Sequence, residues 1–100
     1  MIKVKTEKEN SIYKKISILG HAMYDDYGKD IVCSAASSIA TTTINGILTL
    51  NEESLSYQVK DGSLIIENIQ EDETTQKILE NMVSLLTELE RQYPTNIEVK

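Results

Sequence analysis

The chain contains one cysteine and one histidine, the two residue types that cooperate when a thiol acts as a nucleophile. His21 precedes Cys33 by twelve positions. An imidazole beside a thiol can take up its proton or pair with the thiolate, and can then protonate a leaving amine. If the fold brings the two side chains together, this pair indicates cleavage of an amide bond through a covalent intermediate.

Other interpretations of the two residues are open at this point. A lone cysteine is often a small buried apolar residue, and a lone histidine in a loop is often a solvated polar group. The position of Cys33 favours chemistry, because Asp30 is a predicted helix N-cap whose carboxylate can accept from the N–H of Val32 or Cys33. Cys33 is then the third residue of a helix, where unpaired N–H groups and the helix dipole stabilise a thiolate.

The helix that must position Cys33 is predicted from apolar residues at helical spacing after Asp30. Two such series run along it, Val32, Ala36, Ile39, Thr43, Ile47 and Ala36, Ala40, Ile44, Leu48. Local propensity is weak, because Thr41–Ile44 is β-branched and Gly46 lies inside the segment. The segment Gly20–Lys29 has no apolar period, and we expect it to be a loop that joins the strand before His21 to this helix.

The remaining pattern predicts five strands and a second helix. The expected elements are a strand at Ile2–Val4, a polar turn at Glu7–Ser11, a strand at Ile12–Leu19, a hairpin with strands at Leu55–Val59 and Leu64–Ile66 around Asp61-Gly62, an amphipathic helix from near Asp72 to before Pro94, and a strand at Ile97–Val99. The order ββαββαβ predicts a single α+β domain over residues 1–100. A mixed or antiparallel sheet would pack against the two helices.

Composition excludes several classes of function. Sixteen acidic and ten basic residues give a formal net charge of −6. This disfavours binding to a nucleic-acid backbone and serves either solubility or attraction of a basic partner. One cysteine cannot form an internal disulfide, and one Cys with one His cannot build a Cys/His zinc site without ligands from elsewhere. We expect no metal and no cofactor. No continuous apolar run approaches the roughly 20 residues that cross a bilayer, and the charged N-terminus predicts a cytoplasmic domain without a membrane anchor.

A group of short segments resembles the signature of the ribosomal-processing cysteine proteases, known as Prp. The segments are Gly20-His21-Ala22, Tyr27-Gly28, Asp30-Ile31-Val32-Cys33 and Ser37. The order of strands and helices, the short length and the Ile44-Asn45 segment are also similar across nearly the whole chain. One departure is Ser34, where the family often has alanine directly after the nucleophile.

The resemblance implies a homodimeric endopeptidase that removes a short N-terminal extension from large-subunit ribosomal protein twenty-seven. It implies Cys33 as the nucleophile and His21 as the general base and acid. By the same resemblance Asp30 and Ser37 support the site, and Gly20 lets the His-bearing loop move.

Physical arguments give the supporting residues further interpretations. The charge of Asp30 beside Cys33 would oppose a thiolate, so orienting the loop or His21 is its expected contribution. Ser37 lies at i+4 from Cys33 and either reaches the site or bonds back to its own helix. Backbone N–H groups at the helix start, including that of Cys33, could form an oxyanion hole.

The loop offers candidate contacts for a substrate. Tyr24 and Tyr27 either border a pocket for an aromatic side chain or pack within the loop, and Asp25 and Asp26 either attract a basic peptide or form a solvated tip. We expect few contacts to hold the loop, and therefore expect it to be mobile and to close over a peptide. Two other functions remain open, a non-catalytic acidic module that binds a ribosomal protein and a thiol redox sensor. The first leaves His21 unexplained, and the second lacks a resolving cysteine.

Overall fold

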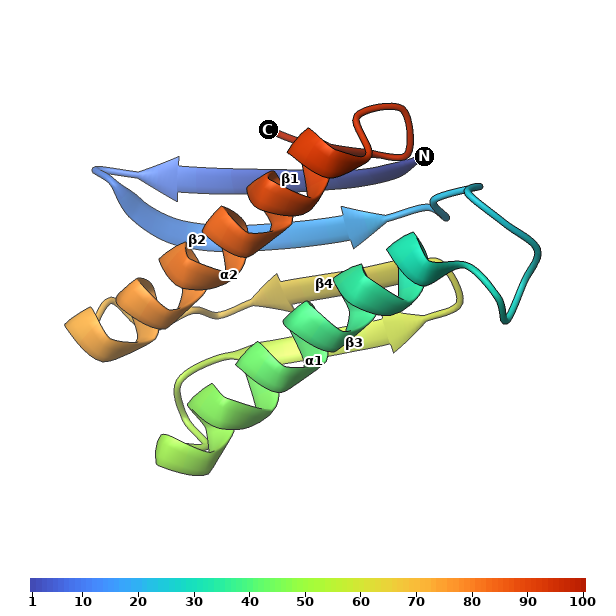
Figure 1. The fold of residues 1–100 in the computed structure, drawn as a ribbon. Coiled ribbons are helices and arrows are strands. Elements are labelled where there is room, and N and C mark those ends of the chain that lie inside the picture. Colours follow the sequence, from blue (N-terminus) through green and yellow to red (C-terminus); the bar gives the residue numbers. More distant parts are fainter.

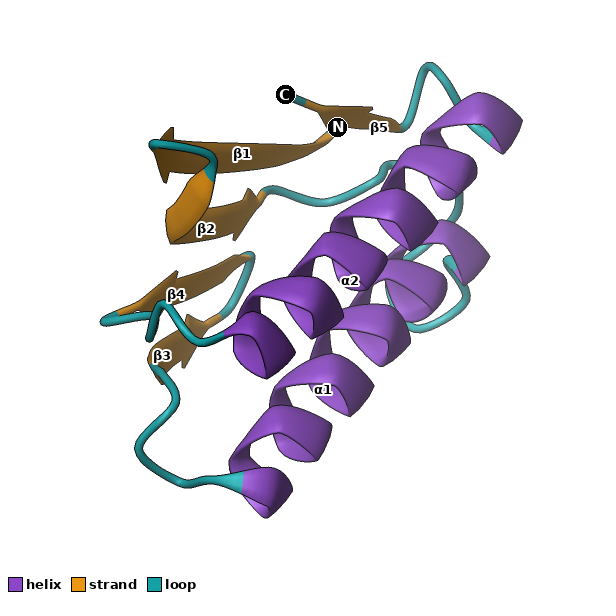
Figure 2. Cartoon of the chain, turned by 90° about the vertical axis from the view of Figure 1, so that its left-hand side faces the viewer, coloured by secondary structure: helices purple, strands orange, loops and turns teal.

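A computed structural model describes all residues from 1 to 100 and shows one five-stranded sheet with both helices on one of its faces (Figures 1 and 2). The elements are β1 (Ile2–Glu9), β2 (Ile12–Leu19), α1 (Ile31–Leu50), β3 (Ser56–Lys60), β4 (Ser63–Glu67), α2 (Glu73–Gln92) and β5 (Ile97–Val99). The strand order is β3-β4-β2-β1-β5, and only the β1–β5 pair is parallel. The predicted α+β class and ββαββαβ order are confirmed.

The first hairpin turn differs from the sequence-based expectation in its extent. Instead of a polar turn over Glu7–Ser11, β1 continues to Glu9 and reverses through Asn10 and Ser11, with φ of 53° and 66°. Two residues with positive φ match the twist of a tight hairpin, and asparagine tolerates that conformation well. The second hairpin forms as predicted, but in its turn only Gly62 has a positive φ, of 69°.

The core lies between the sheet and the two helices, and it fixes the end of α1 that carries Cys33. Its largest fully buried side chains are Ile16, Ile47, Ile66, Leu79, Met82, Leu86, Ile97, Val4 and Val32. Ala36 and Ala40 are small buried residues of α1, and α1 packs beside α2. As a result, the N-terminus of α1, the end of β2 and the β3–β4 turn lie at the same end of the molecule (Figure 1).

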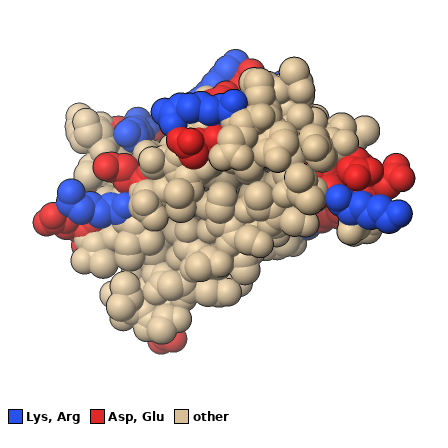
Figure 3. All heavy atoms as spheres, in the orientation of Figure 1, with Lys and Arg blue, Asp and Glu red and all other residues tan.

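By length and composition alone, α1 is apolar enough to cross a membrane, with a mean hydropathy of 1.4 over its most apolar 18-residue window. Core helices of globular domains satisfy the same criterion, and α1 packs its buried face into this domain. No charged residue occurs in α1. In Figure 3 the charged side chains lie toward the borders of the face in view, and most of the area over α1 is free of them.

Candidate active site

Asp30 joins the start of α1 to the loop that precedes it. One carboxylate oxygen accepts from the N–H groups of Val32 and Cys33, at 2.9 and 3.0 Å. The other accepts from Tyr24 and Asp25, at 2.9 and 3.3 Å. Burial alone would raise the pKa of Asp30, but these four backbone N–H groups outweigh it and hold the pKa below its usual value. The predicted cap is confirmed, and the group is a carboxylate bound on both sides.

The thiol of Cys33 lies half-buried in the first turn of α1, facing the loop. Its Sγ accepts a hydrogen bond from the backbone N–H of Ala22, at 3.2 Å. A donor at this distance stabilises a thiolate more than a thiol, because hydrogen bonds to a charged acceptor are the stronger ones. The N–H of Cys33 already donates to Asp30, as do those of Val32 and Ser34, so these three groups are not free to form the expected oxyanion hole.

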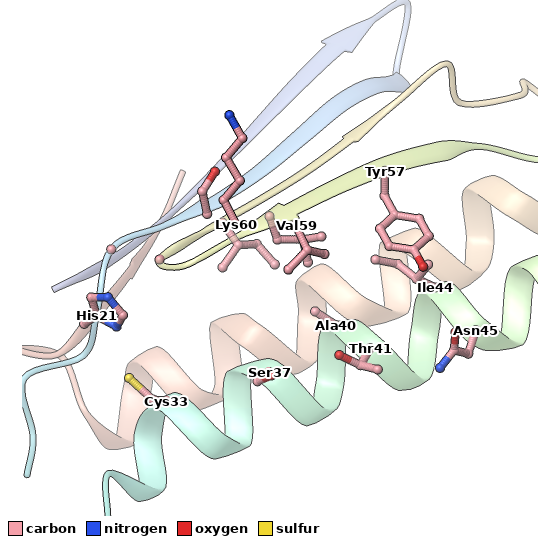
Figure 4. A pocket seen from close by; sticks show the side chains of 15 residues that line it. His21, Cys33, Ser37, Ala40, Thr41, Ile44, Asn45, Tyr57, Val59 and Lys60 are labelled. Atoms are coloured by element: carbon pink, nitrogen blue, oxygen red, sulfur yellow. The ribbon is translucent and has the colours of Figure 1, made fainter. Parts of the chain in front are cut away.

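The imidazole of His21 rests against the β3–β4 turn. Its Nε2 lies 3.8 Å from the Oδ1 of Asp61, and a Cβ on Gly62 would come within 3.0 Å of the same nitrogen. No hydrogen bond joins His21 to Cys33 in this structure, although both side chains face the same cavity (Figure 4). The absence of a side chain at residue 62 therefore leaves the space that the imidazole occupies.

Gly20 lies at a position that has no room for a side chain. Its φ is +92°, and an added Cβ would lie 2.5 Å from the carbonyl oxygen of Met1. Its N–H donates to the carbonyl of Gly62 at 2.8 Å, which continues the contact between the end of β2 and the β3–β4 turn. Glycine is thus required here by close backbone approach as well as by conformation.

Two cavities meet where Cys33, His21 and Ser37 lie. The first, of about 430 Å³, runs between α1 and the β3–β4 hairpin, and Lys60 is the only charged residue that lines it. Its apolar lining includes Ile18, Ala40, Ile44, Tyr57, Val59 and Leu64 (Figure 4). The second, of about 760 Å³, lies between the loop and the start of α1, and its acidic lining residues are Asp25, Asp26, Asp30 and Asp61. The catalytic candidates therefore stand between an apolar groove and an acidic cavity.

Residues 1–98 match the family model of the cysteine protease Prp. The chain belongs to the Prp family. It is accordingly a cysteine protease that hydrolyses peptide bonds, which confirms both the resemblance and the class of reaction inferred from Cys33 and His21.

Relatives in the Prp family support this membership over most of their length. The ribosomal processing cysteine protease Prp of Staphylococcus aureus strain Mu50 is 32% identical over 83 residues, which is 80% of this chain and 78% of the relative. A crystal structure of an S. aureus Prp with a covalently linked product peptide has a TM-score of 0.94 at 29% identity, covering 100% of this chain and 98% of that one. Its complex with a substrate peptide has a TM-score of 0.87 at 28% identity, with the same coverage.

The structure distributes the predicted site residues of this Prp protease unequally. Ser37 lines both cavities and forms no hydrogen bond back to α1. Asp25, Asp26 and Tyr27 border the acidic cavity, and Tyr27 is 91% exposed.

Tyr24 lines neither cavity. Its ring meets the ring of Tyr93 edge-on, with centroids 5.2 Å apart. Through this contact and the bonds to Asp30, the first half of the loop is held to the helices. The expectation that few contacts hold the loop is wrong for that half.

Sequence reasoning missed three groups near the site of this Prp protease. The Asp61-Gly62 pair predicted a turn, but nothing in the sequence indicated that Asp61 would lie beside His21. The alternation of Tyr57 and Val59 predicted a strand, and strand parity alone does not say that these side chains face a groove. Asn96, which donates to the carbonyl of Ala22 at 2.9 Å, lies 74 residues away in sequence and had no local signal.

Proposed function

We propose that Cys33 is the nucleophile of this protease and that His21 is its general base and acid. The supporting observation is that both side chains face the junction of the two cavities, where the Sγ of Cys33 already accepts a backbone N–H. Because His21 rests on the β3–β4 turn, its imidazole must rotate toward the sulfur before it can exchange a proton with it.

The chemistry follows from the two groups. The thiol proton passes to His21, the thiolate attacks the carbonyl carbon, and a tetrahedral oxyanion forms. The C–N bond then breaks, and the amine leaves with the proton that His21 returns to it. Water, deprotonated by His21, hydrolyses the thioester and restores the thiol. Asp30 contributes by holding the loop that carries His21 at a defined place beside α1.

We further propose that the substrate is the N-terminal extension of the precursor of large-subunit ribosomal protein twenty-seven, processed in the bacterial cytoplasm. The S. aureus relatives are named ribosomal processing proteases and were crystallised with substrate and product peptides. The groove suits an apolar extended segment, and the cavity bordered by Asp25, Asp26 and Asp61 suits a basic one. We also propose a homodimer, which rests on the family resemblance.

The test is incubation with a synthetic precursor peptide followed by mass spectrometry of the products. Cys33→Ala, Cys33→Ser and His21→Ala should retain the fold and lose most or all cleavage, because none of them can complete the proton and acyl transfers. Ser84→Ala, on the exposed face of α2, is the matched control and should cleave normally. Release of the trimmed product by Cys33→Ala at the normal rate would contradict the assignment of the nucleophile.

A further inference from the structure

Ala22 stands between the two candidate catalytic residues and touches both. It directly follows His21, and its N–H is the donor to the Sγ of Cys33. The residue is buried, with 1% of its surface exposed. The next residue, Met23, has a φ of +58°, a conformation that a residue with a side chain adopts at some cost. Something must therefore hold the backbone at this point.

The holding contact comes from the other end of the chain. The side-chain Nδ2 of Asn96, in the turn between α2 and β5, donates to the carbonyl of Ala22 at 2.9 Å. The backbone of Asn96 is itself fixed, since its N–H donates to Tyr93 and its carbonyl accepts from Ile2, both at 2.9 Å. The amide thus reaches Ala22 from a turn that is hydrogen-bonded to α2 and to β1. This turn, between α2 and β5, lies near the start of β1 (Figure 2).

The contacts of Ala22 determine where its N–H points, and this N–H is the donor to the Sγ of Cys33. Asn96 binds the carbonyl, the core holds the methyl group, and together they limit where the N–H can point. That N–H meets Cys33, and the preceding peptide carries His21. Releasing the carbonyl would let the strained backbone at Met23 relax, and the relaxation would move the donor away from the sulfur.

We propose that Asn96 is a positioning residue of this protease. Acting through Ala22, it keeps a hydrogen-bond donor on the nucleophile and fixes the start of the loop that bears the general base. This rests on the proposed function, in which Cys33 is the nucleophile.

The variants are Asn96→Ala, which removes the donor, and Asn96→Asp, which keeps the size but turns an acceptor toward a carbonyl. We expect the amide proton of Ala22 to shift upfield in NMR spectra of both. We also expect alkylation of Cys33 by iodoacetamide at neutral pH to slow about tenfold, the effect of losing one hydrogen bond to a charged group. In peptide cleavage, kcat should fall by a larger factor than KM changes.

The matched control is Thr6→Ala, which removes a hydrogen bond from β1 to Lys100 and leaves Ala22 untouched. It should lower the thermal midpoint without changing the Ala22 resonance or the alkylation rate. An unchanged Ala22 resonance and alkylation rate in both Asn96 variants would overturn the proposal, and so would equal effects in Thr6→Ala.

Two further measurements separate the possible failures. If the variants do not fold, hydrogen exchange of the Asn96 side-chain amide in the unsubstituted enzyme tests the proposal instead. Protection would support the hydrogen bond to Ala22, and exchange at the rate of a free amide would contradict it. Cleavage activity in Cys33→Ala would contradict the proposed function. The Ala22 resonance, in contrast, reports on the hydrogen bond from Asn96 whether or not Cys33 is the nucleophile.

Discussion

At the scale of single residues, the carboxylate of Asp30 shows how a charge can be tolerated beside Cys33, the proposed nucleophile. Its negative charge alone would oppose a thiolate on Cys33. Four backbone N–H groups surround its two oxygens, so the charge is compensated by dipoles that also set the loop against the helix. The residue therefore acts on structure first and on Cys33 indirectly.

Replacing Asp30 by asparagine should destabilise the fold by about 1–2 kcal/mol at neutral pH. The asparagine amide has only one accepting oxygen. Its NH₂ group would therefore face either the helix N–H groups or the loop N–H groups, and it cannot accept a hydrogen bond from them. Because the pKa of Asp30 is lowered in the folded state, its contribution to stability is present above the unfolded value near 4 and is lost as the pH falls through the folded value. Urea unfolding from pH 7 to pH 3 should therefore show the two proteins converging in acid.

Asp72→Asn is the control for this prediction, because Asp72 caps α2 by accepting from the N–H of Thr75 with one oxygen. Asparagine can keep that bond, so the loss at pH 7 should be smaller. Equal losses at the two caps would show that the second side of the Asp30 carboxylate contributes nothing.

The glycines of the loop provide a second residue-scale prediction. Gly20→Ala meets both an unfavourable φ and the carbonyl of Met1, so it should cost about 1–3 kcal/mol of folding free energy and lower the thermal midpoint. Gly28→Ala has a similar φ of +85° but no atom within 4 Å of the added Cβ, and it should cost about 1 kcal/mol. Similar thermal midpoints for the two variants would show that the contact with Met1 yields without cost.

At the scale of elements, the site forms where a helix start, a strand end and a hairpin turn meet. α1 brings Cys33, the end of β2 brings His21, and the β3–β4 hairpin closes the groove from the opposite side (Figure 4). β3 is an edge strand and is exposed along its whole length, so the groove that Tyr57 and Val59 line together with α1 is open to a ligand.

The hairpin wall gives a prediction about binding. Val59→Thr keeps the shape and the strand propensity but places a hydroxyl in the apolar groove. We expect KM for a peptide with an apolar segment to rise about threefold to tenfold with kcat nearly unchanged, because uniform binding is lost. Gln58→Thr, at the neighbouring position outside the groove, should leave both constants unchanged. A fall in kcat alone would place Val59 closer to the chemistry than the groove suggests.

At the scale of the whole molecule, the fold was more predictable from sequence than the site. The 3.6-residue and two-residue periods, the Asp30 cap and the Asp61-Gly62 turn are local signals, and each predicted the element that is observed. The groove and the Asn96 contact arise when elements distant in sequence pack, so no local pattern reveals them. The cysteine and histidine became the catalytic candidates because each occurs only once and because the predicted helix start gave Cys33 a physical role.

The net charge of −6 leads to a prediction about ionic strength. With Asp25, Asp26 and Asp61 around one cavity, a peptide with lysines on that side should bind more weakly in high salt. Between about 50 mM and about 500 mM salt, its KM should rise several-fold, because the Debye length shortens from beyond 10 Å to a few ångströms. A peptide with neutral residues at those positions should show little change, and Asp25→Asn combined with Asp26→Asn should flatten the dependence.

The bond from Asn96 to Ala22 also has a consequence in time. A ribosome adds about 5–20 residues per second, so Asn96 is synthesised roughly 4–15 seconds after Ala22. β1 is synthesised before β5, so the parallel pairing of these two strands also cannot form until β5 has been synthesised. During that interval the nascent chain contains its cysteine and histidine but lacks the residue that aligns the donor between them. We therefore expect the protease to be inactive while it is being translated, and to acquire its reactive thiol only when its last elements are in place.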